Sequence, residues 1–150
     1  MSTSTKIPVV LLADDDSDDQ LLAQDALAEA GYTVDLRFVK DGVELMDYLY
    51  CREKFFSPAS APRPSLILLD LNMPRKDGRE ALQEIKADPN FRRIPVVILT
   101  TSNSHIDIYR AYQLGANSFI TKPVAFNLLV QVMKTLGDYW FRVAALPPKV

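Results

Sequence analysis

Short apolar segments recur along the chain, and each ends in polar or turn-forming residues. Residues 9–13, 66–69 and 96–99 are continuously apolar. Four or five apolar residues in a row, bounded by turn signals, are typical of a strand buried on both faces of a parallel sheet. Residues 34–38 alternate between apolar and charged side chains, which indicates a strand with one more exposed face, and residues 118–121 form a short fifth candidate.

Helical patterns and helix boundary signals separate these strands. The expected helices begin near Ser17, Gly42, Arg79, His105 and Phe126. The apolar stripe expected on the first helix is Leu22, Ala23, Ala26, Leu27 and Ala30. Gly31, Asp88-Pro89 and Gly115 are the stop signals of the first, third and fourth helices, and the second is expected to run to about Cys51. Five strands alternating with helices through short connections predict an α/β fold with a doubly wound, five-stranded parallel sheet and right-handed crossovers.

Composition excludes several classes of protein. A chain of 150 residues with 48% hydrophobic and 24% charged residues suits one globular domain. A net charge of −2 gives no basic surface for nucleic acid. Cys51 is the single cysteine and His105 the single histidine, too few for an internal disulfide or a zinc site. With no apolar signal segment and no membrane-spanning run, we expect a cytoplasmic protein without a membrane or nucleic-acid partner.

Polar side chains follow four of the predicted strands. Asp14 and Asp15 follow the first, Asp70 the third, Thr100 the fourth and Lys122 the fifth. Because parallel strands share a direction, these ends can converge at one edge of the sheet. Three neighbouring carboxylates repel one another, and a divalent cation relieves that repulsion; hard oxygen ligands favour Mg²⁺. A lysine and a hydroxyl beside the cation would suit a phosphoryl group.

These residues belong to a longer set of motifs that resembles a known family. The set comprises Asp14-Asp15, Asp70-x-Asn72-Met73-Pro74, Asp77-Gly78, Thr100 and Lys122-Pro123. In this order and spacing it resembles the CheY-like receiver domain of bacterial two-component response regulators, over about residues 7–137. The resemblance implies a flavodoxin-like three-layer sandwich with strand order 2-1-3-4-5.

The resemblance also implies a role for each acid. Asp70 would accept a phosphoryl group from the phosphohistidine of a kinase. Asp15 would bind Mg²⁺ directly, as would Asp70 and the backbone carbonyl of Asn72, with Asp14 acting through water; Mn²⁺ could substitute. The protein would be a phosphoacceptor that assists its own phosphorylation and dephosphorylation, not an enzyme with a separate substrate.

Three further residues would couple the phosphoryl group to the protein surface. By the resemblance, Lys122 would hold a phosphoryl oxygen, and Thr100 would swing its hydroxyl onto the group. Phe119 would turn inward as Thr100 moves, although it could also be simple core filler. The Lys122-Pro123 peptide is expected to be cis, and Phe126 to be part of the core.

The ends of the chain suggest a subgroup. We expect an N-terminal tail at residues 1–6, a receiver domain at 7–137 and an aromatic C-terminal extension at 138–150, with no output domain after it. The extension and the proline-containing loop 57–65 resemble single-domain regulators that partner bacterial phytochrome kinases. A homodimer through the fourth helix, fifth strand, fifth helix and the C-terminal aromatics would fit. In the alternative, the extension folds back on its own domain.

Other functions remain as alternatives. A phosphatase with an aspartate nucleophile would want a second acid two residues after Asp70, where this chain has Asn72. A pseudo-receiver acting only in docking would lack one of the acid, threonine or lysine positions, and none is missing. The acids from Asp14 to Asp19 also resemble the start of a calcium loop, but Asp19 stands where that loop needs glycine. Asp16, Asp18 and Asp19 are interpreted as acids of a helix start.

Overall fold

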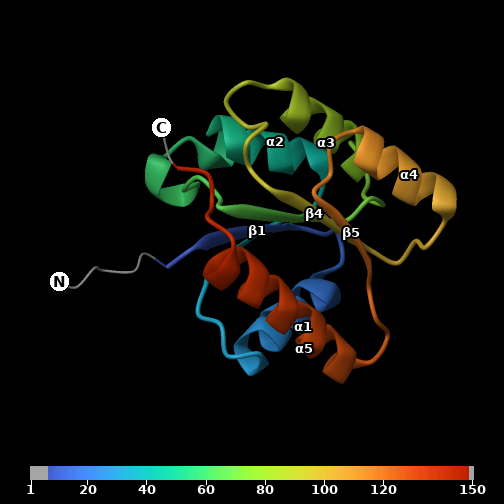
Figure 1. Ribbon diagram of the computed structural model, residues 1–150. Helices are drawn as coiled ribbons and strands as arrows, with labels where there is room; N and C mark the ends of the chain where they lie inside the picture. The colour runs from blue at the N-terminus through green and yellow to red at the C-terminus, as the bar shows by residue number, and fades with distance from the viewer. Residues whose placement is uncertain (1–6, 149–150) are drawn as a thin grey trace.

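The sheet is the centre of the molecule. The computed structural model describes residues 7–148, in which five parallel strands pair in the order β2-β1-β3-β4-β5 (Figure 1). The strands are β1 Val9–Ala13, β2 Asp35–Val39, β3 Leu66–Leu69, β4 Val96–Thr100 and β5 Ser118–Thr121. The predicted α/β fold class and strand order are therefore confirmed.

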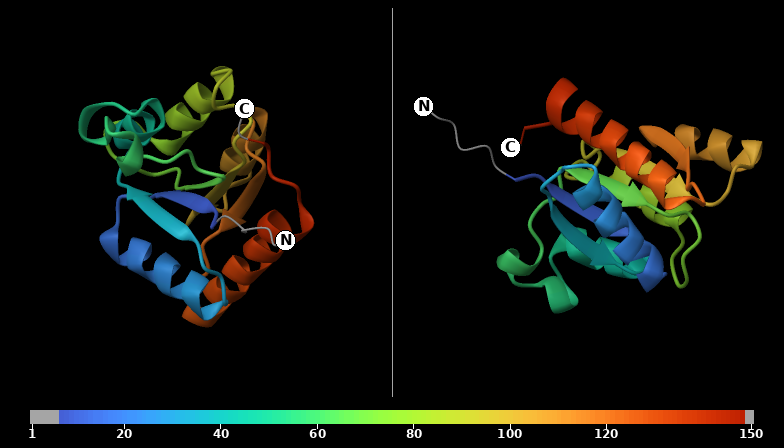
Figure 2. Two further views of the ribbon diagram at one scale, coloured as in Figure 1. Left: turned by 90° about the vertical axis from the view of Figure 1, so that its left-hand side faces the viewer. Right: turned by 90° about the horizontal axis from the view of Figure 1, so that it is seen from below.

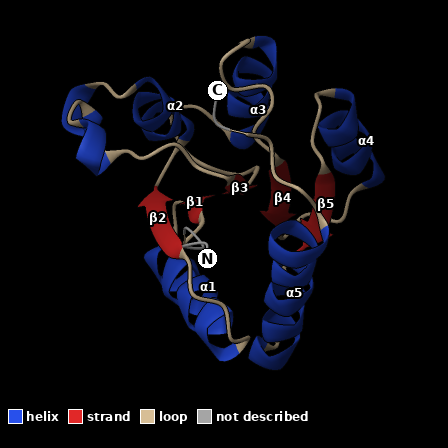
Figure 3. Cartoon of the chain, turned by 60° about the vertical axis from the view of Figure 1, so that its left-hand side comes forward, coloured by secondary structure: helices blue, strands red, loops and turns tan. Residues whose placement is uncertain are grey.

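Helices cover both faces of the sheet (Figure 3). Helices α1 (Ser17–Glu29) and α5 (Phe126–Asp138) pack on one face. The other face is covered by α2 (Gly42–Tyr50), α3 (Gly78–Ala87) and α4 (His105–Gln113). The α2–β3 connection contains two short 3-10 turns, Glu53–Phe55 and Pro58–Ser60, and a π-helical turn, Tyr139–Val143, continues α5.

Burial follows the hydrophobic pattern of the sequence. Every residue of β1, β3 and β4 is buried, because helices cover both faces of these central strands. The edge strands β2 and β5 are mostly half-buried. Ala13 pairs with Leu69, so the acids that follow β1 and β3 leave the sheet side by side.

Helix caps fix the loops at the carboxyl edge of the sheet. Asp16 caps α1, its carboxylate accepting hydrogen bonds from the N–H groups of Asp18 and Asp19. Asp77 and Glu80 form a capping box at the start of α3. A Cβ at Gly78 would lie 2.2 Å from the carbonyl oxygen of Asp70. Only glycine therefore lets α3 begin so close to the end of β3.

Three expectations are wrong. Leu22, expected on the buried stripe of α1, is 44% exposed, whereas Ala23 and Leu27 fill that stripe. Phe126, expected in the core, is 41% exposed because it is the first residue of α5. The Lys122–Pro123 peptide is trans, the isomer that an X–Pro bond favours unless its surroundings select the other.

The chain beyond α5 returns along its own domain (Figure 2). Trp140 and Phe141 are partly buried against the core between the sheet and the α1–α5 layer. The hydroxyl of Tyr32 donates to the carboxylate of Asp138, and the guanidinium of Arg142 lies 5.4 Å from the centre of the Tyr32 ring. Through residue 148, the extension therefore matches the alternative in which it folds back.

Within residues 7–148, none of the helices has the length and apolar character needed to cross a bilayer. The proline-containing loop 57–65 packs partly against its own domain, since Ala61 is buried and the carbonyl of Pro62 accepts a 2.7 Å hydrogen bond from the hydroxyl of the buried Tyr48.

Candidate phosphoacceptor and metal site

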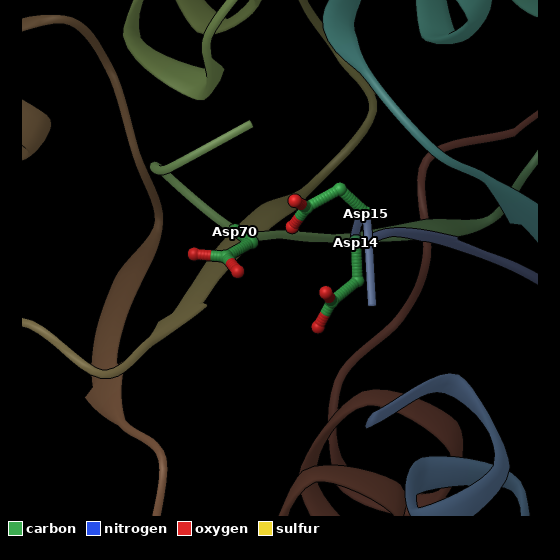
Figure 4. Close-up of side chains that lie close together, drawn as sticks. All are labelled: Asp14, Asp15 and Asp70. Carbon is green, nitrogen blue, oxygen red and sulfur yellow. The ribbon is translucent and has the colours of Figure 1, made fainter. Parts of the chain in front are cut away.

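The sheet brings together the polar residues that follow its strands. Asp14 and Asp15 come directly after β1, and Asp70 comes directly after β3 (Figure 4). Thr100 is the last residue of β4, and Lys122 follows β5. These residues are scattered over 109 positions of the sequence, yet all lie at the carboxyl edge of four neighbouring strands.

Three carboxylates form the floor of this site. One oxygen from each of Asp14, Asp15 and Asp70 lies within 4.8 Å of the others. Asp14 is 2% and Asp70 8% exposed, whereas Asp15 faces solvent. Two negative charges are thus held out of water beside a third, and that arrangement is unfavourable without a cation.

Lys122 supplies one positive charge. Its Nζ lies 2.6 Å from Asp14 Oδ2, 3.1 Å from Asp19 Oδ2 and 3.3 Å from Asp70 Oδ2. The three N–H donors of the ammonium can therefore each meet a carboxylate. Burial alone would lower the pKa of Lys122, but the hydrogen bond to Asp14 and the charges of Asp70 and Asp14 outweigh it and raise that pKa. Lys122 is a permanent cation here.

The site favours the charged form of Lys122 but disfavours the charged form of Asp14. Burial raises the pKa of its carboxyl above the ordinary value, and the hydrogen bonds from Lys122 and from the N–H of Asp16 only partly oppose this. The asymmetry has a simple cause: Lys122 is shared among three acids, whereas Asp14 is almost fully buried and also feels the charge of Asp70. A single ammonium does not neutralise the cluster.

Hydrogen bonds orient the Asp70 carboxylate. The hydroxyl of the fully buried Thr100 donates to Asp70 Oδ1 at 2.7 Å, and the N–H of Asn72 donates to the same oxygen at 3.2 Å. Asp70 Oδ2 faces Lys122. Phe119, on the neighbouring strand β5, is half-buried and packs against the core on the α2–α4 side of the sheet.

The donor set fits a hard divalent cation. Carboxylates are the ligands that Mg²⁺ and Mn²⁺ prefer, and the exposed Asp15 leaves one side open for retained waters. The N–H of Asn72 reaches Asp70, so the loop that carries the Asn72 carbonyl also borders the cluster. A bound divalent cation would neutralise the negative charge that Lys122 leaves uncompensated.

Sequence reasoning missed two features near the site. Asp19, interpreted only as a helix-start acid, contacts Lys122. Ser102, in the loop after β4, donates to Asp107 Oδ2 at 2.6 Å, and Arg79 donates to Asp107 Oδ1 at 2.9 Å. These bonds tie the loop after Thr100 to α3 and α4. No local signal marks either feature, because both depend on which side chains face one another across elements.

Comparisons with known proteins agree with this geometry. A family model described as "Response regulator receiver domain" matches residues 10–134. The response regulator Rcp1 from a strain of Synechocystis is 38% identical over 148 residues, which cover 98% of this chain and 99% of Rcp1. A crystal structure of the Mn²⁺-bound form of Rcp1 covers 94% of this chain and 99% of its own, with a TM-score of 0.84.

Two other solved structures are as similar. The phosphorylated cyanobacterial phytochrome response regulator RcpA is 43% identical, with 95% of this chain and 100% of RcpA covered and a TM-score of 0.87. Response regulator RPA3017, in red light signalling of R. palustris, is 38% identical, with 95% and 100% covered and a TM-score of 0.90.

Proposed function

Because the chain belongs to the family of response regulator receiver domains, we propose that it is a single-domain response regulator phosphorylated on Asp70. The observation that carries this proposal is the cluster around Asp70: a buried carboxylate within hydrogen-bond reach of both Thr100 and Lys122 and beside two more acids. The phosphodonor is the phosphohistidine of a sensor histidine kinase in the cytoplasm.

The chemical step is a phosphoryl transfer. A carboxylate oxygen of Asp70 bonds to phosphorus as the P–N bond of the phosphohistidine breaks, and the bonding electron pair leaves with the imidazole nitrogen. Lys122 holds a phosphoryl oxygen, which offsets the charge that gathers there. The 3.3 Å distance from its Nζ to Asp70 Oδ2 supports this role.

A divalent cation, Mg²⁺ or Mn²⁺, supplies the remaining positive charge when bound. Asp15, Asp70 and the backbone carbonyl of Asn72 are its proposed protein ligands, and Asp14 acts through water. The carboxylate cluster supports this assignment, as does the relative Rcp1, whose structure has been determined in a Mn²⁺-bound form.

Thr100 and Phe119 are the proposed switch. Phosphorylation takes the Asp70 side chain from about −1 to about −2 and adds acceptor oxygens. Thr100 then donates to the phosphoryl group, and Phe119 fills the space that its movement leaves. The existing bond from Thr100 to Asp70 supports this role. The phosphoryl group therefore biases an equilibrium that is already present in the protein.

The kinase is proposed to be a bacterial phytochrome, because RcpA is a phytochrome response regulator. Self-association is proposed through α4, β5 and α5. Tyr109 is 64% and Tyr112 50% exposed on α4, and Ile120, Leu128 and Val132 line an open apolar groove between β5 and α5. Among the C-terminal aromatics, Tyr139 is 52% exposed and can contribute, whereas Trp140 is partly buried in its own domain.

Incubation with acetyl phosphate and Mg²⁺ tests the phosphoacceptor. Intact-mass measurement should show one phosphoryl group that survives acid but is removed by alkali or hydroxylamine. Asp70→Asn should remain unmodified under the same conditions. An unmodified wild-type protein with a correctly folded spectrum, or equal modification of Asp70→Asn, would overturn the proposal.

Sedimentation velocity tests self-association, with and without phosphorylation. We expect a dimer at tens of micromolar in at least one of the two states, weakened by Tyr109→Glu. Leu21→Glu is the matched control, since Leu21 is 57% exposed but lies on α1, which is not part of the proposed interface. A monomer in both states would contradict the dimer without affecting the phosphoacceptor assignment.

A further inference from the structure

The surroundings of Lys122 contain a residue to which the proposed chemistry gives no role. Lys122 contacts three carboxylates, and two of them, Asp14 and Asp70, are also members of the carboxylate cluster that fits a divalent cation. The third, Asp19, lies outside that cluster and belongs to the first turn of α1. The cation and the ammonium therefore compete for Asp14 and Asp70, but not for Asp19.

We propose that Asp19 is a positioning residue for Lys122, which keeps the ammonium beside Asp70 when a divalent cation is bound at the Asp14–Asp15–Asp70 cluster. This role rests on the proposed function, because it presupposes the cation site. Without Asp19, Lys122 would have only Asp14 and Asp70 as partners, and a divalent cation bound beside them would repel its ammonium. With Asp19, the ammonium keeps one charged hydrogen bond and stays within reach of an incoming phosphoryl oxygen.

The space around Lys122 allows its ammonium to move away from Asp14. A cavity of about 50 Å³ lies against Asp14, Asp19 and Lys122. Its other walls are apolar, and they are formed by Leu12, Leu22, Ala23, Leu99, Pro123 and Leu129. Lys122 therefore has room to move away from Asp14, and Asp14 and Asp19 are the acidic side chains that line this cavity. Side-chain exposures of 13% for Lys122 and 35% for Asp19 place their contact partly out of water, where the attraction is stronger than at an open surface.

Asp18 provides a matched control. It is adjacent in sequence, carries the same charge and lies in the same first turn of α1, but it is exposed. Its side chain makes no hydrogen bond or ion pair within residues 7–148, and its backbone N–H donates to Asp16 Oδ1. Asp18→Asn and Asp19→Asn thus remove the same charge and the same interaction with the helix dipole, and only the second removes a contact with Lys122.

Mg²⁺ affinity, measured by calorimetry in the absence of any phosphodonor, tests the proposal. We expect Asp19→Asn to weaken Mg²⁺ binding by about threefold to tenfold, because Lys122 then competes for Asp14 and Asp70 with no alternative partner. Asp18→Asn should change the affinity by less than about twofold. Asp19→Glu, which keeps the charge, should recover most of the loss.

A second background separates positioning from simple charge attraction. In Lys122→Met, Asp19→Asn should weaken Mg²⁺ binding no more than Asp18→Asn does. An equally large effect of Asp19→Asn with and without Lys122 would overturn the proposal. So would equal effects of Asp18→Asn and Asp19→Asn in the wild-type background.

A measurement on Lys122 itself needs no lysine variant. Labelling with an amine-acylating reagent in saturating Mg²⁺, quantified by peptide mass spectrometry, should modify Lys122 several times faster in Asp19→Asn than in Asp18→Asn. Equal labelling would contradict the positioning role. A wild-type protein that binds Mg²⁺ with the expected variant pattern but takes no phosphoryl group would overturn the proposed function and leave the role of Asp19 supported.

Discussion

Two aspartates at the same edge of the sheet are equally buried and behave in opposite ways. Asp14 and Asp41 are each 2% exposed. Asp41 caps α2 by accepting the N–H of Glu44 at 2.8 Å. It also receives two hydrogen bonds from Arg75, at 2.8 and 3.2 Å. Burial would raise the pKa of Asp41, but Arg75 and the backbone N–H groups outweigh it and lower that pKa, whereas burial prevails at Asp14.

The difference shows that the state of a buried acid depends on its partners as well as on its burial. Asp41 has its own guanidinium, in the bidentate geometry that suits a carboxylate best. Asp14 shares one ammonium with Asp19 and Asp70. The first region is a satisfied structural pair. The second holds unresolved charge, which is the arrangement expected where a protein binds a cation or carries out chemistry.

Removing the positively charged side chain from each region should give the largest difference in phosphorylation rate. Lys122→Met should slow phosphorylation by acetyl phosphate by about 100-fold to 1000-fold, because a charged contact to the developing phosphoryl charge is lost. Arg75→Met should change the rate by less than about threefold, because Arg75 contacts Asp41 and not the site. Stopped-flow or quench-flow measurement at saturating Mg²⁺ gives both rates. Similar losses for the two variants would remove the distinction between the regions.

Replacing Asp41, the acid with its own partner, should lower the free energy of unfolding. Asp41→Ala removes the α2 cap and leaves the buried N–H of Glu44 without its acceptor, so we expect a loss of about 2–3 kcal/mol in the free energy of unfolding. Asp77→Ala removes the cap of α3 at a more exposed position and should cost about 1 kcal/mol. Urea denaturation measures both. The comparison is contradicted if Asp41→Ala costs no more than Asp77→Ala.

Neutralising Asp14, the acid that shares its partner, should raise the free energy of unfolding instead of lowering it. Asp14→Asn keeps an acceptor for Lys122 but removes a charge whose burial is unfavourable, so metal-free protein should gain about 1 kcal/mol in unfolding free energy. The wild type should gain stability when Mg²⁺ is added, and the variant should gain less, since ligand binding to the folded state stabilises it. Urea titrations with EDTA and with Mg²⁺ test this. A less stable Asp14→Asn in EDTA would show that Asp14 is satisfied.

Acid titration should distinguish Asp41 from Asp14 by their pKa values, and we expect this effect to be the smallest. Because the pKa of Asp41 is lowered from its ordinary 3.8, its contribution to stability is present above pH 3.8 and is lost as the pH falls through the lower folded value. The pKa of Asp14 is raised, so its ionisation reduces stability as the pH rises through its folded value. Side-chain ¹³C shifts of metal-free protein should show Asp41 titrating below Asp14. The reverse order would contradict the assignment.

Much of the fold could be predicted because the relevant signals are local. Unbroken apolar runs such as residues 66–69 indicate strands buried on both faces, and helix start and stop signals divide the segments between them. Parallel order then places Asp70 near Asp14 without any knowledge of side chains. The exposure of Leu22 and Phe126 was not predictable in the same way, because Leu22 lies beside the buried face of α1 and Phe126 is the first residue of α5.

The finer structure of the site depends on contacts between distant elements. Six acids among residues 14–25 look alike in sequence, and only the position of Lys122 after β5 distinguishes Asp19 from Asp18. The pairing of Asp41 requires Arg75 to adopt a φ of +66° in the loop after β3, which no residue pattern indicates. The packing of Phe141 similarly depends on Tyr32, more than a hundred positions away.

The position of the phosphoryl group after transfer from an autophosphorylated histidine kinase tests the central claim most directly. Borohydride reduction converts an aspartyl phosphate to homoserine, and tandem mass spectrometry then identifies the modified residue. We predict modification at Asp70, with Asp14, Asp15 and Asp41 unmodified. A phosphoryl group on another residue, or none on intact Asp70 with a kinase that phosphorylates other receivers, would contradict the account.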